Sequence, residues 1–538
     1  MMKRLSFILV AFLLLVLAAC GGAEEEEGQN EPSENFKEEG MPIVKEPIEL
    51  EIFAGKSATT ADDWNDVLLL NEYEKMTNIH IDWEQVPAEG LDEKRNITLG
   101  SGDLPDAFYA ANIPVSDIQK YGEQGVFIPL NDLIEKYAPN ISKVLDEHPD
   151  IKKGLTFPDG NIYSVPTVYS PDFPSLLVGA KPWINQEWLD ELGLENPETT
   201  DDLYEVLKAF KENEDVLNPE HGVIPLGSVA EMSRIIHWIS GAFGVQNKGQ
   251  LHTLIDEDPE TEELRFFPTS DDYRDMLDYL NKLYTEGLIE ETIYSIDVDQ
   301  FLANAAEEKY GAIQFYNPIE LFGEEVGEQF TVGKPLEGPN GHKMYTGVTS
   351  PLRSLGNFLI TKENEHPAEL IRWIDYFWSD EGMLMFFMGI EGETYEMTDD
   401  GPQLMDHITN SEEGLTLTQE LAKYLINPGG NHPVMVTDDY FTGSENAPTD
   451  IEAMEELEPY LIDEVWPAFT YTEEETDDMS ILETDISKYV QEKQAQFITG
   501  EIPLDDNEWN EYIETVEGMD LERYMEIQHA AYERYLEN

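Results

Sequence analysis

The side chains that most often carry enzyme chemistry are either scarce in this sequence or too abundant to be informative. The 538 residues include one cysteine and ten histidines, and the histidines show no close metal-ligand spacing. The sequence contains no HExxH zinc helix, no GxSxG nucleophile elbow and no GxxxxGK[ST] phosphate loop. Its 112 acidic residues supply any carboxylate pair that a glycosidase needs, so such pairs carry no information. We therefore predict no catalytic residue, no metal and no cofactor, and a surface glycosidase stays the least favoured alternative.

The single cysteine, Cys20, lies where a different chemistry is possible. Lys3 and Arg4 form a basic start, and residues 5–17 form an apolar run that is shorter than the roughly 20 residues of a membrane span. The sequence LAACG around Cys20 resembles a bacterial lipobox, in which the thiol receives lipid. An ordinary secretory signal with a chance cysteine is the alternative. We expect a signal peptide over residues 1–19, a lipid on Cys20, and a chain anchored at the extracytoplasmic face of the cell membrane.

The charge of the chain restricts its partners. Removal of residues 1–19 takes away Lys3 and Arg4, which leaves 30 basic residues against 112 acidic ones and a formal charge of −82. Such a surface repels phosphates, so we expect no nucleic-acid partner and no membrane contact other than the lipid. Residues 20–45 are rich in Glu, Gly, Pro, Asn and Ser, which predicts a disordered acidic tether.

The remaining residues have the patterns of an α/β fold that is too large for one core. Single cores stop growing near ~250–300 residues, which predicts two lobes. Alternating apolar residues predict strands at 48–53 and 79–83 with a helix near 62–76 between them, and residues 107–109 predict a third, buried strand. The β-α-β order predicts a parallel sheet. The turn Pro158-Asp159-Gly160-Asn161 predicts a hairpin between residues 155–157 and 162–166.

Several segments, in this order, resemble the carbohydrate-binding class of solute-binding lipoproteins of bacterial ABC importers. After the lipobox they read SGDLPDAF, GVFIPLNDLI, PDGNIYSVP, INQEWLDELGLENPETTDDLYEVLKAF, SLGNFLITKENEHPAELIRWIDYFWSDEGMLMFF, MGIEGETYEMTDDG and FITGEIPLDDNEWNEYIETVEGMDLERYMEIQHAAYERY. The resemblance covers essentially the whole chain after the signal peptide.

The resemblance implies a two-lobed, periplasmic-binding-protein-like fold of type II, with discontinuous lobes joined by crossing hinge segments. It places the crossings near 165–170, 347–353 and 426–433. Lobe one would comprise residues 46–165 and 350–425, and lobe two residues 166–349 and 426–538. The implied function is to capture an oligosaccharide in the cleft between the lobes and deliver it to an ABC transporter permease. We expect a monomer that is not an enzyme.

A sugar ring is held by flat aromatic faces and by a few convergent hydrogen-bonding groups. Candidates are polar and aromatic residues in loops, at strand ends or at the implied crossings, although each could equally serve the core or an ion pair. They are Tyr109, Asn112, Tyr169, His237, Trp238, Tyr316, Asn317, Arg353 and Tyr395. A cleft with many carboxylates and few aromatics would instead favour a peptide or a basic small molecule, drawn by the acidic field.

Some relatives in this family carry a calcium-binding loop between a helix and an Ile-Pro strand. The corresponding residues here are 213–225, where Val216 and Leu217 interrupt the oxygen ligands and Gly222 and Val223 replace expected carboxylates. Six to eight oxygen ligands are difficult to assemble from this loop. We therefore predict no calcium site there.

Overall fold

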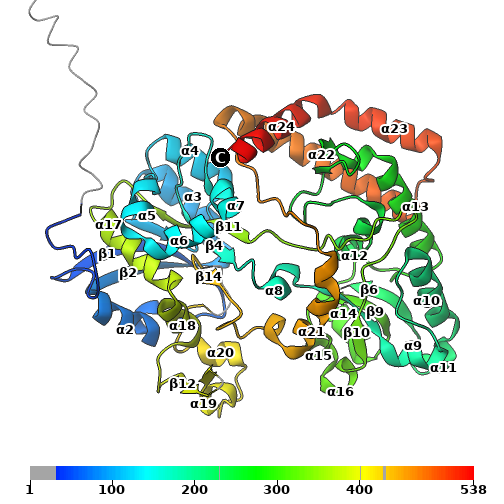
Figure 1. Cartoon of the computed structure of the whole chain (residues 1–538), viewed down its shortest axis with the longest axis horizontal. Helices are drawn as coiled ribbons and strands as arrows, with labels where there is room; N and C mark the ends of the chain where they lie inside the picture. Colours follow the sequence, from blue (N-terminus) through cyan, green and yellow to red (C-terminus); the bar gives the residue numbers. More distant parts are fainter. Residues whose placement is uncertain (1–31, 229–230, 400, 428–431, 538) are drawn as a thin grey trace, which may run out of the picture.

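The structure is a computed structural model, and it describes residues 32–228, 231–399, 401–427 and 432–537. It has two lobes, each with its own apolar core and its own sheet. Figure 1 shows lobe one (blue, cyan and yellow) beside lobe two (green, orange and red), with the last helices running across the top toward lobe one. Cys20 and the predicted signal peptide lie outside the described residues.

Lobe one is built on a six-stranded mixed sheet in the order β14-β4-β11-β3-β1-β2. The first three strands of the chain run parallel, and β11 is antiparallel to both of its neighbours. The strands are β1 (Ile48–Lys56), β2 (Ile79–Pro87), β3 (Ala107–Tyr109), β4 (Val165–Tyr169), β11 (Leu352–Ile360) and β14 (Met435–Val436), with a hairpin of β12 (Tyr395–Thr398) and β13 (Gly401–Leu404). The helices are α2 (Leu68–Thr77), α3 (Leu91–Ser101), α4 (Val115–Glu123), α5 (Asn131–Tyr137), α6 (Pro139–Glu147), α7 (Pro149–Leu155), α17 (Pro367–Asp375), α18 (Asp380–Met388), α19 (Asp406–Thr409) and α20 (Leu417–Leu421).

The local predictions for lobe one are confirmed for the strands and corrected at two places. The strands predicted at 48–53, 79–83 and 107–109 are β1, β2 and β3. The helix predicted near 62–76 is divided, because Val67 is extended between a 3-10 turn at Trp64–Asp66 and α2. The predicted hairpin is wrong. Residues 158–160 do form a turn, but the segment before them is the end of α7, and β4 pairs with β11 and β14 instead.

Lobe two has a four-stranded sheet in the order β10-β5-β9-β6 and a larger share of helix. The strands are β5 (Lys181–Asn185), β6 (Ile224–Ser228), β9 (Tyr310–Phe315) and β10 (Phe330–Val332), with a separate pair of β7 (Ile255–Glu257) and β8 (Leu264–Phe266). The helices are α8 (Pro174–Val178), α9 (Gln186–Leu192), α10 (Thr200–Glu212), α11 (Glu214–Leu217), α12 (Glu231–Ile239), α13 (Asp271–Thr285), α14 (Val298–Ala306), α15 (Pro318–Phe322), α16 (Glu324–Gly327), α21 (Pro448–Leu457), α22 (Glu473–Thr499), α23 (Asp506–Glu517) and α24 (Leu521–Glu537). Within the described ranges, no helix combines the length and the apolar composition that crossing a membrane requires.

The chain passes between the lobes after β4, before β11 and after β14. The second passage lies within the predicted crossing 347–353. The first begins only after Tyr169, at the end of the predicted crossing 165–170, because residues 165–169 form β4 of the lobe-one sheet. Residues 166–169 therefore belong to lobe one and not to lobe two. The third lies later than the predicted segment 426–433, because Met435 and Val436 pair in parallel with Val168 and Tyr169 as the edge strand of the lobe-one sheet. Lobe one therefore extends to residue 436 rather than 425. Residues 428–431 of the predicted crossing lie outside the described part of the chain.

The predicted disordered tether is wrong for residues 32–45. Ile43 and Val44 are fully buried, and the ring of Phe36 packs edge-on against Tyr137 of lobe one. The guanidinium of Arg372 in α17 donates hydrogen bonds to the carbonyls of residues 37 and 40. The apolar residues in this segment are few, but they are the ones that bind it to the lobe.

The C-terminal helices of lobe two return to lobe one and form a second contact between the lobes. Lys153 at the end of α7 donates a hydrogen bond of 3.0 Å to the carbonyl of Leu536, and its ammonium lies 5.9 Å from the ring centroid of Tyr535. A Cβ at Gly154 would lie 2.7 Å from the side chain of Leu352 and 3.0 Å from the ring of Pro467, so any larger residue would force these neighbours to shift. The lobes thus meet at the crossings and again at the chain's C-terminal end.

Candidate ligand-binding site between the lobes

A cavity of about 590 Å³ lies where the crossing segments pass between the lobes. All three passages contribute to its lining, and α12, β9 and a loop of lobe two complete it. The lining residues are Tyr169, Leu176, Leu177, Val178, Gly179, Ala180, Ser233, Arg234, His237, Gln250, Gln314, Tyr316, Tyr345, Gly347, Thr349, Arg353 and Glu445. A cavity of this size at a hinge is suited to a small ligand that both lobes can touch.

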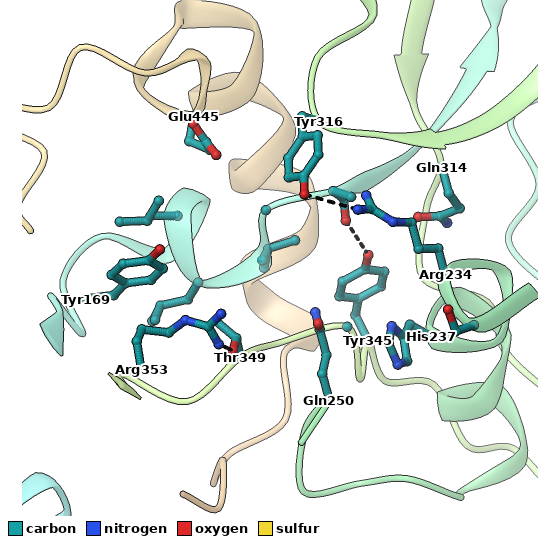
Figure 2. Close-up of a pocket in the computed structure, with 17 residues that line it drawn as sticks. Tyr169, Arg234, His237, Gln250, Gln314, Tyr316, Tyr345, Thr349, Arg353 and Glu445 are labelled. Atoms are coloured by element: carbon teal, nitrogen blue, oxygen red, sulfur yellow. Dashed lines mark hydrogen bonds between the residues drawn. The ribbon is translucent and has the colours of Figure 1, made fainter. Parts of the chain in front are cut away.

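One side of the cavity is formed by Tyr169 and Arg353, the residues at the end of β4 and the start of β11. The guanidinium carbon of Arg353 lies 5.3 Å from the ring centroid of Tyr169, and its Nη1 donates a hydrogen bond to the hydroxyl of Thr349. Figure 2 shows both side chains on the side opposite Arg234 and Gln314. The cation and the ring therefore form a flat surface at the hinge.

The opposite side is formed by α12 and by the end of β9. Arg234 and His237 are three residues apart on α12 and share one face of the helix, which places both at the cavity. The Nη2 of Arg234 donates to the hydroxyl of Tyr316 at 3.0 Å, and its guanidinium carbon lies 4.8 Å from that ring's centroid. The Nη1 of Arg234 and the Nε2 of Gln314 are buried without a hydrogen-bond partner in the described part of the chain. A ligand that offers acceptor oxygens would satisfy both donors.

His237 and Tyr345 are neutral groups at this side of the cavity. Burial, with a smaller effect of the nearby Arg234 cation, lowers the pKa of His237 to about 4, so its imidazole is uncharged at neutral pH. Burial raises the pKa of Tyr345, whose hydroxyl donates to the carbonyl of Ala180 at 3.2 Å. A neutral imidazole can donate from one nitrogen and accept at the other, which suits a hydroxyl-bearing ligand.

A buried ion pair adjoins the lining of the cavity, because Lys181 follows Ala180 and contacts Gly179, and both of these residues line it. The ammonium of Lys181 donates to Asp450 at 2.7 Å and to the carbonyl of Gly179 at 3.1 Å, and the amide of Asn317 donates to the other oxygen of Asp450. These contacts connect the start of β5 with α21 and with the end of α8, and Figure 1 shows α8 beside α21. Burial raises the pKa of Glu445, the carboxylate that lines the cavity near this pair.

The charge of the lining differs from that of the chain as a whole. Arg234 and Arg353 form no ion pair within the described residues, and Glu445 is the only carboxylate among the lining residues. In a chain with a net charge of −80, two unpaired guanidinium groups in one cavity are unusual. Rings and donors arranged in this way can stack on and hydrogen-bond a polar ligand, and they oppose a cationic one.

The absence of a calcium site stays a prediction. The described ranges contain no group of three or more His, Cys, Asp or Glu residues that could hold a metal ion. In the loop 213–225, residues 214–217 form the short helix α11, and the amide of Asn218 donates to the carbonyls of Glu307 and Glu308.

The comparisons with known proteins agree with this architecture. Residues 58–384 match the model of the bacterial extracellular solute-binding protein family, which is more than half of the chain. The chain belongs to this family. The prediction of a solute-binding protein rather than an enzyme is therefore confirmed.

Two relatives match this solute-binding protein over most of its length. It is 30% identical, over 99% of its length and 98% of the other chain, to the fructooligosaccharide ABC transporter substrate-binding protein FusA of Streptococcus pneumoniae. The structure of FusA in complex with kestose is 27% identical, covers 91% of this chain and 100% of its own, and has a TM-score of 0.72. A solute-binding protein from Bifidobacterium longum infantis, 21% identical over 91% of this chain and 99% of its own, shares the fold with a TM-score of 0.75. The predicted two-lobed α/β fold is confirmed.

Of the nine residues predicted for the site of this solute-binding protein, four line the cavity: Tyr169, His237, Tyr316 and Arg353. Two others belong to the cores of the lobes. Tyr109 is buried among the rings of lobe one, and Trp238 is fully buried in lobe two, where its indole donates to the carbonyl of Lys334. Neither side chain can face a ligand in the cavity, so both predictions are corrected.

The remaining three predicted residues also lie outside the lining. Asn112 is exposed on lobe one, and its carbonyl accepts from Arg95. Asn317 is buried and serves as the N-cap of α15 and as a partner of Asp450. Tyr395 is buried at the start of the β12–β13 hairpin. The side chains of Asn317 and Tyr395 have structural positions that the sequence pattern does not distinguish from ligand contacts, whereas Asn112 contributes its backbone carbonyl and leaves its side chain exposed.

The other thirteen of the 17 lining residues were not predicted, and they include Arg234, Gln250, Gln314 and Tyr345. The sequence does contain a pattern that indicates Arg234. It lies three residues before His237 in the largely apolar segment SRIIHWIS, so the two side chains share one face of the helix. Gln314 is a polar residue inside a buried strand, which is a weaker signal. Gln250 and Tyr345 lie in loops, and no local pattern marks them.

Proposed function

We propose that this protein captures an oligosaccharide in the cavity between its lobes and delivers it to the permease of an ABC importer. The names of its relatives support the substrate class, since FusA binds fructooligosaccharides and a Bacillus subtilis relative, 28% identical over 53% of this chain, is named as a polygalacturonan- and rhamnogalacturonan-binding protein. Delivery to a permease is supported by the name of FusA, which is an ABC transporter substrate-binding protein.

The observation that carries the proposal is the composition of the lining. Three tyrosine rings, Tyr169, Tyr316 and Tyr345, are combined with the unpartnered donors of Arg234 and Gln314. Aromatic faces bind the C–H surface of a sugar ring, and donors bind its hydroxyl oxygens. The unpaired guanidinium groups argue against the alternative of a basic small molecule, which the net charge alone had favoured.

Ligand-induced thermal stabilisation tests the proposal. The chain from residue 20 onward, with Cys20→Ser to keep it soluble, is heated with kestose, longer fructooligosaccharides, oligogalacturonides, diacetylchitobiose and maltotriose. A ligand that binds only the folded state raises the Tm by mass action, so at least one class should do so. Intact sugar recovered after denaturation is the expected result for a binding protein, whereas shortened sugar would indicate a glycosidase. If no saccharide raises the Tm, the proposal is wrong.

We also propose that lipid on Cys20 holds the protein at the extracytoplasmic face of the membrane and that it acts as a monomer. The lipobox-like sequence supports the anchor, and a relative named lipoprotein LipO, 28% identical over 61% of this chain, is consistent with it. The full-length chain should sediment with membranes, whereas the Cys20→Ser variant should be released into the medium after cleavage or remain as uncleaved precursor. Sedimentation of the soluble chain should give the monomer mass.

A further inference from the structure

The arginines of this chain differ in whether they have a carboxylate partner. Among the side chains that the structure describes, most arginines form an ion pair with Asp or Glu, namely Arg95, Arg265, Arg274, Arg523 and Arg534. Arg372 instead donates to two backbone carbonyls of the N-terminal segment. The two arginines that remain in the described ranges, Arg234 and Arg353, both line the cavity between the lobes. In a chain with 112 acidic residues, the arginines without a described acidic partner or backbone acceptor pair thus lie together in one place.

The lining of this cavity is also poor in carboxylates. Glu445 is the one acidic residue among the 17 that line it. Burial raises the pKa of Glu445, with a smaller opposing effect of the nearby Lys181 cation, so its carboxyl group is ionised less readily than an exposed one. The lining therefore carries two positive charges and at most one negative charge, whereas the chain as a whole carries −80.

Two buried donors in the same cavity lack an acceptor. Gln314 is 1% exposed, and neither its Nε2 nor the Nη1 of Arg234 has a hydrogen-bond partner in the described part of the chain. The guanidinium groups of Arg234 and Arg353 lie against the rings of Tyr316 and Tyr169, at 4.8 and 5.3 Å from the ring centroids. Arginine presents planar donors that match the two oxygens of a carboxylate, and such charge-assisted bonds are roughly twice as strong as neutral ones. A carboxylate would therefore satisfy these donors better than a hydroxyl group.

We propose that the ligand of this cavity is an acidic oligosaccharide, whose sugar residues carry carboxylate groups. The proposal rests on the function proposed above, and it adds the charge of the ligand as the property that is recognised. Because Tyr169 and Tyr316 each lie beside one of the two guanidinium groups, one sugar residue can contact a ring and place its carboxylate at the neighbouring cation. The ligands in the names of the relatives include both neutral and acidic saccharides, so they do not decide the charge.

The acidic surface of the protein is compatible with such a ligand. Exposed charges are screened over about 8 Å at physiological ionic strength, whereas partly buried charges are screened much less. The two guanidinium groups of the lining therefore contribute more than the distant surface carboxylates to the potential that a bound ligand experiences.

Calorimetric titration with matched charged and uncharged sugars tests the proposal. The acidic panel contains oligogalacturonides, alginate oligosaccharides, glucuronate-bearing xylo-oligosaccharides and sialyllactose. Each is paired with its methyl ester, which keeps the chain length and the hydroxyl groups but removes the charge. Kestose, maltotriose and diacetylchitobiose form the neutral panel.

The variants Arg234→Gln and Arg353→Gln remove a charge from the cavity and keep a hydrogen-bond donor. Arg274→Gln is the matched control, because it removes the charge of a lobe-two arginine that lies 5.7 Å from the ring centroid of Trp509 and does not line the cavity. The Tm of each variant without sugar reports whether it folds. The comparison of acid with ester on the wild-type chain needs no variant.

An acidic sugar should bind most tightly, and its methyl ester at least about tenfold more weakly. Each cavity variant should weaken the acid about 10- to 100-fold and the ester no more than about threefold, because hydrogen bonds between charged groups contribute most. Arg274→Gln should change neither. A neutral sugar as the tightest ligand, an ester that binds as well as its acid, or cavity variants that weaken acid and ester equally or not at all would overturn the acidic ligand while the proposed function stands. Absence of binding by every sugar of both panels would overturn both.

Discussion

The buried ion pair of Lys181 and Asp450, next to the cavity lining, gives the sharpest prediction for stability. The side chains of Lys181 and Asp450 are 0% and 1% exposed, and their charged atoms lie 2.7 Å apart. Burial lowers the pKa of Lys181 and raises that of Asp450, so each charge depends on the other for its stability. Lys181→Met removes one charge and leaves Asp450 buried, with the amide of Asn317 as its remaining partner.

Removing one member of a buried pair costs about 3–5 kcal/mol, because the other charge stays uncompensated. At about 2–4 °C per kcal/mol for a unit of this size, the Tm of lobe two should fall by about 6–20 °C. The double variant Lys181→Met with Asp450→Asn carries no buried charge and keeps an acceptor for Asn317. Its stability should return to within about 1 kcal/mol of the wild type, since replacing a whole buried pair is often neutral.

Scanning calorimetry and urea titration of the four chains of this double-mutant cycle give the coupling energy. Lys136→Met is the matched control, because the pair Lys136–Asp132 lies at the surface with 57% and 70% of its side chains exposed, and its loss should cost less than about 1 kcal/mol. A single variant Lys181→Met that loses less than the control, or a double variant that loses the sum of the two single ones, would refute the reasoning.

Three further predictions concern the cavity and the N-terminal segment. Arg234→Ala should weaken sugar binding about 10- to 100-fold in calorimetric titration, because hydrogen bonds to a charged donor contribute about 1.5–3 kcal/mol. The imidazole of His237 should show no titration by NMR between pH 8 and about 5.5. Its folded pKa, about 4, lies below the unfolded value of about 6.5, so its contribution to the free energy of unfolding is full above pH 6.5 and falls as the pH drops toward 4. Phe36→Ala should lower the free energy of unfolding by about 2–3 kcal/mol in urea titration, because it removes a buried ring that holds residues 32–45 on lobe one.

Each of these three has a result that contradicts it. Equal sugar affinity of Arg234→Ala and wild type would mean that the unpartnered Nη1 of Arg234 does not face the ligand. A midpoint near pH 6.5 for His237 would show an imidazole in contact with water. An unchanged urea midpoint for Phe36→Ala would leave the N-terminal segment without a role in stability.

The patterns that are local in sequence predicted the elements that are local in structure. The alternation in residues 48–53 and 79–83 predicted β1 and β2, and the apolar run 107–109 predicted β3, because side-chain periodicity depends only on neighbouring residues. In the same way, Ser379 accepts a hydrogen bond from the backbone of Gly382 as the N-cap of α18, which its position before Asp380 and Glu381 indicates.

The candidate site depended on packing that no local pattern contains. His237 and Trp238 are adjacent on α12, so their side chains point in different directions from the helix axis. His237 lines the cavity and Trp238 is buried in the core, and this outcome depends on where β9 and the crossings lie relative to α12. Tyr109 and Tyr169 both end strands of one sheet. β3 lies between β1 and β11, so Tyr109 is covered, whereas β4 leads directly into the first crossing and leaves Tyr169 at the hinge.

The sequence by itself determined that the chain has two cores, that residues 48–53, 79–83 and 107–109 form strands, and which family the chain resembles, since each of these follows from composition, periodicity or the order of segments. Only the tertiary structure decided which side chains share a cavity. The lining comes from residues up to 276 positions apart, from Tyr169 to Glu445, and their convergence depends on three passages of the chain between the lobes. The buried pair of Lys181 and Asp450 joins segments 269 positions apart, and no local pattern around either residue indicates its partner.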